Sequence, residues 1–134
     1  MLTGHCLCGR VRYEADAELS PIIHCHCETC RRAHGSAFSS IAAVPRKSFR
    51  RAAGEELLSA FQSSPGKFRR FCSLCGSHLV AERVGHGHVM VRPGWLDTPV
   101  KPKVMGHIWR SDAARWYDPN EPVAEFAEAY VAPG

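Results

Sequence analysis

The chain has 134 residues, of which 45% are hydrophobic and 22% are charged, and this balance fits one soluble globular domain with a modest core. No apolar run is long enough to span a bilayer and no basic segment leads into a signal-peptide stretch, so we expect a cytoplasmic protein without a membrane contact. The formal net charge of +4 would fall to near +1 if the seven cysteines bound two zinc ions as thiolates, which argues against a nucleic-acid partner.

Cysteines enter the chain early, as the pair Cys6 and Cys8. In a flat strand their sulfur atoms would point the same way but stand too far apart to share one ion, so we expect a turn here. Residues 10–15 follow with charged and apolar side chains in alternation, which predicts a half-buried strand.

The densest cysteine cluster lies at residues 25–32, Cys-His-Cys-Glu-Thr-Cys-Arg-Arg, where three cysteines share six positions. The short apolar segment at residues 22–24 predicts a strand that ends at the first two of these cysteines. Cys30 is then expected in a turn or in one turn of helix.

The rest of the chain is predicted to form short strands separated by glycine and proline turns. Strands are expected at residues 36–44 (stopped by Pro45), 57–61, 67–71, 79–84, 88–91 and 103–109. Residues 46–51 are expected to be a basic loop, and residues 111–117 one or two helical turns capped by Ser111. This pattern indicates a mainly β fold with few short helical turns, and we expect residues 1–134 to form a single zinc-binding domain.

The cysteine spacing predicts two zinc sites of different kinds. Cys6 and Cys8 join the pair in Cys72-Ser-Leu-Cys75-Gly76 to supply four thiolates, the ligand set of a structural zinc. The central cluster supplies only three, which is the ligand count of a catalytic zinc with an open position. The alternative is a second structural site, closed by a fourth ligand drawn from His24, His26 or His34.

Several spaced motifs resemble one protein family, the glutathione-dependent formaldehyde-activating enzymes, which include centromere protein V. The resemblance runs in order to about Trp116 and is carried by Gly4-x-Cys6-x-Cys8-Gly9-x-Val11-x-Tyr13, Cys25-His26-Cys27-x-x-Cys30-Arg31, Ser64-Pro65-Gly66-Lys67, Phe71-Cys72-x-x-Cys75-Gly76-Ser77, Gly94-x-Leu96-Asp97 and Gly106-His107-Ile108.

The resemblance implies two facing antiparallel sheets of the β-tent type, stabilised by zinc. It implies a structural zinc on Cys6, Cys8, Cys72 and Cys75, and a second zinc on Cys25, Cys27 and Cys30 whose open site meets substrate. The family's namesake reaction joins glutathione to formaldehyde, gives S-hydroxymethylglutathione, and is classed as a carbon–sulfur lyase activity. A small-molecule thiol and an aldehyde are therefore the expected partners.

An open zinc site could hold a thiol as its thiolate and present it to an aldehyde carbon, because Zn²⁺ lowers the pKa of a bound thiol or water. Basic side chains would then bind the carboxylates of glutathione, and the candidates are Arg31, Arg32, Arg46, Lys47 and Lys67. His107 has either a pocket role or a structural one. The three tryptophans, Trp95, Trp109 and Trp116, are expected in the core or the pocket wall, whereas Arg69 and Arg70 are expected to face solvent.

A different class of function is a zinc-stabilised binding module without turnover. The fourth position on the central zinc discriminates the two, since exchangeable solvent there favours an enzyme and a protein ligand favours a module. A thiol reductase is disfavoured, because it needs a redox cysteine beyond the seven that the two zinc sites use.

Overall fold

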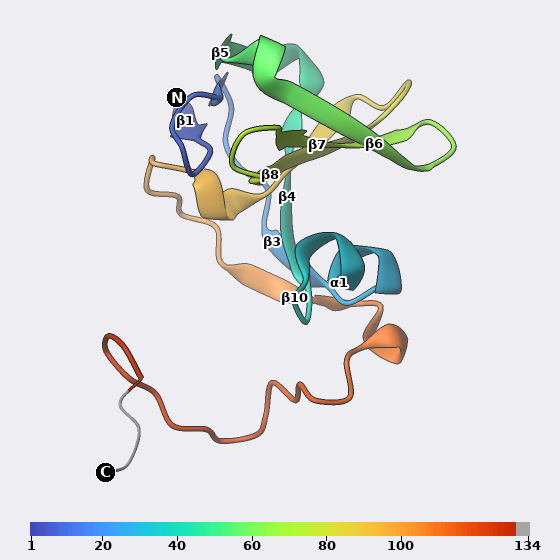
Figure 1. The fold of residues 1–134 in the computed structure, drawn as a ribbon, viewed down its shortest axis with the longest axis vertical. Helices are drawn as coiled ribbons and strands as arrows, with labels where there is room; N and C mark the ends of the chain where they lie inside the picture. Colours follow the sequence, from blue (N-terminus) through green and yellow to red (C-terminus); the bar gives the residue numbers. More distant parts are fainter. Residues whose placement is uncertain (131–134) are drawn as a thin grey trace.

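The computed structural model describes residues 1–130 and contains two β-sheets, one α-helix and short 3₁₀ turns (Figure 1). The predicted mainly β fold is therefore confirmed. The smaller sheet has the strand order β1-β2-β5 and the larger one the order β10-β3-β4-β9-β8-β7-β6. Residues 131–134, which the predicted domain includes, lie outside the described residues.

The bounds of the elements follow the predicted segments in most places. The strands are β1 (Leu2–His5), β2 (Arg12–Ala15), β3 (Ile22–Cys25), β4 (Ser39–Pro45), β5 (Phe49–Ala53), β6 (Leu58–Ser64), β7 (Lys67–Cys72), β8 (His78–Arg83), β9 (His88–Val91) and β10 (Val104–Ile108). The helices are α1 (Glu28–His34), η1 (Arg46–Ser48), η2 (Glu55–Leu57), η3 (Pro93–Trp95) and η4 (Arg110–Asp112).

Two local predictions are wrong. The expected basic loop at residues 46–51 is a 3₁₀ turn followed by β5, an edge strand whose arginines stay exposed while Arg50 and Arg51 pair with Glu14 and Glu55. An edge strand with a charged surface lacks the apolar alternation that identifies a strand. Ser111 lies inside η4 and does not cap it with a side-chain hydrogen bond.

One strand pair in the larger sheet is parallel. β10 runs alongside β3 with His107 opposite His24 and Ile108 opposite Cys25, whereas the other strand pairs are antiparallel. The backbone N–H of His26 continues this contact by donating to the carbonyl oxygen of Ile108 at 3.0 Å. The segment after β3 is therefore held from a strand about 80 residues further along the chain.

The two sheets share one apolar core. Tyr13 of β2 and Val11, which directly precedes that strand, pack with Val44, Leu79 and Val91 from the larger sheet, and this burial drives the two layers together. Within the core the Tyr13 ring lies 4.6 Å from the Phe49 ring and 5.6 Å from the Trp95 ring, measured between centroids.

The C-terminal segment leaves the sheets after Tyr117, whose ring lies 5.9 Å from that of His26. In Figure 1 the orange-to-red trace runs away from both layers, and Val123, Phe126 and Tyr130 are exposed. None of the helices formed by residues 1–130 has the length and apolar character needed to cross a membrane.

Candidate metal centres

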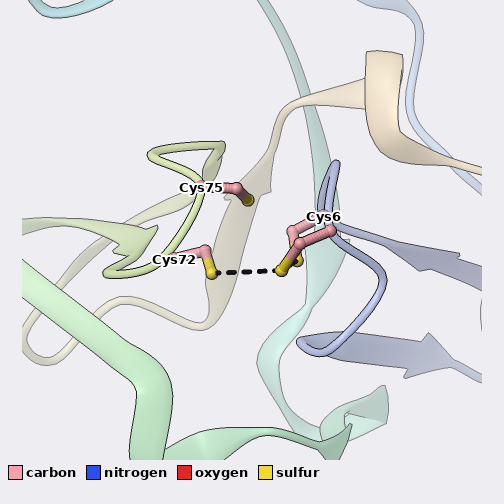
Figure 2. A group of neighbouring side chains, drawn as sticks. Cys6, Cys72 and Cys75 are labelled. Atoms are coloured by element: carbon pink, nitrogen blue, oxygen red, sulfur yellow. Dashed lines mark hydrogen bonds between the residues drawn. The ribbon is translucent and has the colours of Figure 1, made fainter.

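The outer cluster joins the two sheets through four cysteine side chains (Figure 2). Cys6 and Cys8 lie in the turn between β1 and β2, as predicted, while Cys72 ends β7 and Cys75 lies in the turn before β8. All four sulfur atoms lie within 4.8 Å of one another, with 3.5 Å between Cys6 and Cys8 and 3.8 Å between Cys8 and Cys72. A tetrahedral zinc with Zn–S bonds of about 2.3 Å separates its sulfurs by about 3.8 Å, so this donor set fits a zinc-sized ion.

Hydrogen bonds around the outer cluster hold its sulfur atoms in place. The backbone N–H of Val11 donates to Cys6 Sγ at 3.4 Å, and the Ser77 hydroxyl lies 3.3 Å from Cys75 Sγ. The contact with Ser77 makes the largest contribution to lowering the pKa of the Cys75 thiol, which falls to about 5. Gly76, at φ 76°, allows the tight turn that brings the two sulfurs of the second pair together.

The central cluster forms where β3 gives way to α1. Cys25 is the last residue of β3, Cys27 is the N-cap of α1, and Cys30 lies in the first turn of the helix. Cys27 Sγ accepts a hydrogen bond from the Cys30 backbone N–H at 3.3 Å, which satisfies one of the free N–H groups of the helix start. The three sulfur atoms lie within 4.8 Å of one another, so this group, too, can hold a metal ion.

No fourth protein ligand joins the central sulfurs within that distance among residues 1–130. The histidines considered for this place point elsewhere. The Nδ1 atom of His24 lies 3.0 Å from Ser40 Oγ, and the Nε2 atom of His26 lies 2.7 Å from Nδ1 of His107. His34 is also outside the three-sulfur group.

The buried polar side chains of the described chain gather around the central cluster. They are His26, Ser39, Arg69 and Arg92. Ser39 lies opposite Cys25 in the β3–β4 pair, and the Nη1 and Nη2 atoms of Arg69 lie 3.9 and 3.8 Å from Cys30 Sγ. Because an unpaired buried polar group destabilises a fold, their gathering at one place indicates a functional centre.

The surroundings of the central sulfurs give Cys25 and Cys30 different pKa values. Burial raises the pKa of the Cys30 thiol, but the neighbouring Ser39 hydroxyl, Cys27 and the Arg69 guanidinium outweigh it and bring the pKa to about 7. Burial raises the pKa of Cys25 to about 12. A cation among the three sulfurs would favour the thiolate form of each, so metal binding here would release protons.

The expectation that Arg69 faces solvent is wrong. Arg69 is only 3% exposed, and its guanidinium points from β7 toward Cys30. Arg70, its neighbour, is half-buried and pairs with Glu82 at 3.2 Å. Arg92 was not among the sequence candidates. It directly follows the buried Val91, so the alternation of apolar and polar residues would place its side chain on the solvent face, yet Arg92 is buried as well.

The sequence candidates for carboxylate binding differ in their surroundings. Arg32 pairs with Glu28 at 3.0 Å and Arg46 with Glu82 at 3.1 Å, so both guanidinium groups already have carboxylate partners. Lys67 is half-buried, and its pKa is lowered first by burial and then by the charge of Arg69. Cys30 raises the pKa of Lys67, so the Lys67 ammonium lies within electrostatic range of the central cluster. The remaining candidates are Arg31, which is half-buried, and Lys47, which is exposed.

The tryptophans divide between core and surface. Trp95 packs in the core and donates its indole N–H to the Leu79 carbonyl at 2.6 Å, as a wall residue should. Trp109 and Trp116 are 58% and 74% exposed, so the expectation that they lie in the core or the pocket wall is wrong.

A cavity of about 660 Å³ adjoins the outer cluster. Cys6, Ser39 and Arg92 line it, whereas the three central cysteines do not. His34 and Trp95 form further parts of the wall. This volume is in the range that holds small-molecule ligands.

Comparison with known proteins gives one family and several relatives. A family model described as glutathione-dependent formaldehyde-activating enzyme matches residues 1–112. A Colletotrichum graminicola protein, whose name provisionally assigns it the same activity, is 28% identical over 110 residues, covering 82% of this chain and 51% of the relative. An uncharacterized lyase of Schizosaccharomyces pombe is 33% identical over 76 residues, covering 57% of this chain and 53% of the relative. The chain thus spans about half the length of these curated relatives.

A solved structure shares the fold. A crystal structure of a Rhodobacter sphaeroides protein, a structural genomics target, superposes with a TM-score of 0.60 at 21% sequence identity. The match covers 76% of this chain and 98% of that one.

Proposed function

This chain belongs to the glutathione-dependent formaldehyde-activating enzyme family, and on that premise we propose that it is a zinc-dependent enzyme of the carbon–sulfur lyase type. Its substrates would be a thiol and a small aldehyde, with glutathione and formaldehyde as the first pair to test. The observation that supports this best is the central group of three cysteine sulfurs, which has no fourth protein ligand among residues 1–130.

In this proposal the two clusters have different roles. Cys6, Cys8, Cys72 and Cys75 would hold a structural zinc, because four thiolates complete a tetrahedron. Cys25, Cys27 and Cys30 would hold the second zinc and leave one position for substrate. When bound there, the ion would supply a Lewis-acid site that lowers the pKa of a thiol at neutral pH.

The charges around the central cluster favour an anion at the open position. Three thiolates and one dication leave a charge of −1, and the buried Arg69 and Arg92 guanidinium groups raise it to +1. Lys67 adds positive charge from a half-buried position. In a low-dielectric site this surplus stabilises a substrate thiolate more than a neutral water molecule.

The proposed reaction needs no oxidant or reductant. The thiol gives up its proton and its sulfur forms a bond to the aldehyde carbon, while the electron pair of the C=O π bond moves to the oxygen. That oxygen takes up one proton and becomes the hydroxyl of the S-hydroxymethyl product. Within the chain, the Arg69 contact with Cys30 keeps one sulfur of the cluster anionic and fixed in place during these changes.

Metal counting and product detection together test the proposal. Native mass spectrometry of protein purified without chelator should show two zinc ions per chain, and one in a Cys27→Ser variant. NMR with ¹³C-labelled formaldehyde and glutathione should show S-hydroxymethylglutathione forming above the uncatalysed rate with the wild type but not with the variant. Two bound zinc ions without any acceleration by the wild type would contradict the enzyme and favour the binding module.

A further inference from the structure

The exposed apolar side chains of this protein are concentrated near the end of the described chain. Thirteen large apolar residues are exposed among residues 1–130, and eight of them lie at or after the start of β10. These eight are Val104, Met105, Ile108, Trp109, Trp116, Val123, Phe126 and Tyr130. Singly exposed apolar residues are normal on a protein surface, but a concentration of them marks an interaction site.

The strand β10 also has a free edge. It is the last strand of the larger sheet and pairs with β3 on one side, and no strand formed by residues 1–130 pairs with its other side. Native proteins usually protect such an edge with charged side chains or cover it, because its unpaired N–H and C=O groups can pair with another chain. In β10 the exposed side chains of Val104, Met105 and Ile108 are apolar. The edge is therefore suited to pairing with a further strand.

The chain beyond β10 ends in an arm, residues 118–130, that lies away from the fold. In Figure 1 the arm runs below β10, on the side away from the rest of the larger sheet. Every residue of the arm is exposed, and none belongs to a helix or strand. Its Val123, Phe126 and Tyr130 are 73%, 51% and 68% exposed, so the arm buries little apolar surface against its own chain. Segments of this kind bury their apolar side chains when they bind a partner.

The charges along this part of the chain fall into two groups of opposite sign. The arm holds four acidic residues and no lysine or arginine, whereas residues 101–116, here called the basic block, hold four basic residues and one acidic residue. The basic side chains are Lys101, Lys103, Arg110 and Arg115, and the acidic ones of the arm are Asp118, Glu121, Glu125 and Glu128. All eight are exposed, and none takes part in an ion pair within residues 1–130. Such a surface is complementary to a copy of itself, because the basic block of one copy can face the arm of the other.

The apolar area at this end of the chain is large enough for a stable dimer. A large aromatic side chain has an area of about 150–250 Å², so the eight partly exposed apolar side chains present roughly 1,000 Å² in one copy. A standard protein–protein interface takes about 800 Å² from each partner. The eight side chains alone therefore supply the area that one partner must contribute.

We propose that residues 101–130 form the interface through which two copies of this protein associate about a two-fold axis. The two β10 strands pair antiparallel across the axis, the apolar side chains lie between the copies, and each arm lies against the basic block of the partner. A two-fold interface closes on itself, so association stops at the dimer. The interface goes beyond the proposed reaction and does not depend on it.

Analytical ultracentrifugation of the metal-loaded full chain over a range of concentrations tests the interface. The wild type should sediment with the mass of two chains. Met105→Glu should raise the dimer dissociation constant at least about tenfold, because it places a charge among the apolar side chains of the paired strands. Val84→Glu makes the same kind of change at a residue that is 72% exposed outside residues 101–130, and it should leave the constant unchanged. Both side chains are exposed in the single chain, so both variants should keep the wild-type circular dichroism spectrum.

Charge reversal tests the contact between the arm and the basic block. A variant with Glu125→Lys and Glu128→Lys, and another with Lys101→Glu and Lys103→Glu, should each self-associate more weakly than the wild type. An equimolar mixture of the two should recover dimers, because each arm again faces a block of opposite charge. Failure of the mixture to recover dimers would overturn the placement of the arm. A wild type that stays monomeric at all concentrations, an oligomer larger than a dimer, or a Met105→Glu variant that dimerises as tightly as the wild type would overturn the interface.

Discussion

Removing one cysteine from each cluster should have very different effects on stability. Cys75→Ser and Cys27→Ser make the same atomic change, and both side chains are half-exposed, so neither opens a large core cavity. In Cys27→Ser the new hydroxyl can still cap α1, because serine is a favoured N-cap residue. The difference between the variants therefore reports what each metal contributes.

The size of the difference follows from the loop that each cluster closes. The outer cluster joins Cys8 to Cys72, which are 64 positions apart, whereas Cys25 and Cys30 of the central cluster are only five positions apart. The loop-closure cost scales as (3/2)RT ln n, so the outer cross-link contributes about 2 kcal/mol more to the free energy of unfolding. For a domain of this size that corresponds to about 8 °C in melting temperature.

Thermal melts followed by circular dichroism, with zinc counted on the same samples, measure this difference. We expect Cys75→Ser to lose one zinc and to melt at least about 8 °C below Cys27→Ser, or to be insoluble, since a structural zinc contributes free energy comparable with total domain stability. Equal melting temperatures, or a soluble Cys75→Ser that keeps two zinc ions, would refute the assignment of a structural role to the outer cluster.

Two further predictions concern packing and protonation. Gly4→Ala should destabilise the fold by about 1–3 kcal/mol in denaturant melts, because a Cβ at this position overlaps the Trp95 ring. Gly87→Ala, which has open space around it, should have little effect. Equal effects of the two substitutions would contradict the packing argument. Burial, followed by the charges of Arg92, His78 and Arg69, lowers the pKa of His34 to about 4. The unfolded state therefore binds this proton first, and stability should fall from about pH 6.5 toward pH 4. His34→Gln should flatten this loss, and the exposed His86→Gln should not; an unchanged pH profile in His34→Gln would show that His34 is not its source.

Local chemistry explains why the cysteine clusters could be predicted from sequence. Thiolates within a few positions share one ion only in certain turns, so the spacing alone restricts the geometry at Cys25, Cys27 and Cys30. Alternation likewise predicted the strand at residues 12–15, because its side chains face either core or solvent. These features depend on neighbours in the chain and not on the final pairing of strands.

Features that depend on distant pairing could not be predicted in the same way. The bond between His26 and His107 exists because β10 lies parallel to β3, and nothing in either segment specifies that neighbour. Arg69 carries a charge, which predicts a surface position, and it is buried only because the fold places β7 beside Cys30. Periodicity identifies the faces of a strand but cannot tell a solvent face from a polar interior.

Arg92 provides a last test, because its two possible partners predict opposite effects on stability. If the cysteine thiolates already balance its charge, Arg92→Met removes one member of a buried ionic group and should lower the melting temperature and the zinc content. If its partner is the substrate carboxylate, the free protein carries the cost of a buried cation. Arg92→Met should then melt at the wild-type temperature or up to about 8 °C above it, a gain of about 2 kcal/mol, with two zinc ions retained. We expect the first result, because Cys30, Cys25 and Cys27 all raise the pKa of Arg92 and so favour its charged form, which places the guanidinium within electrostatic range of the central sulfurs. A wild-type or higher melting temperature with two zinc ions retained would show that the cysteine thiolates do not balance the charge of Arg92.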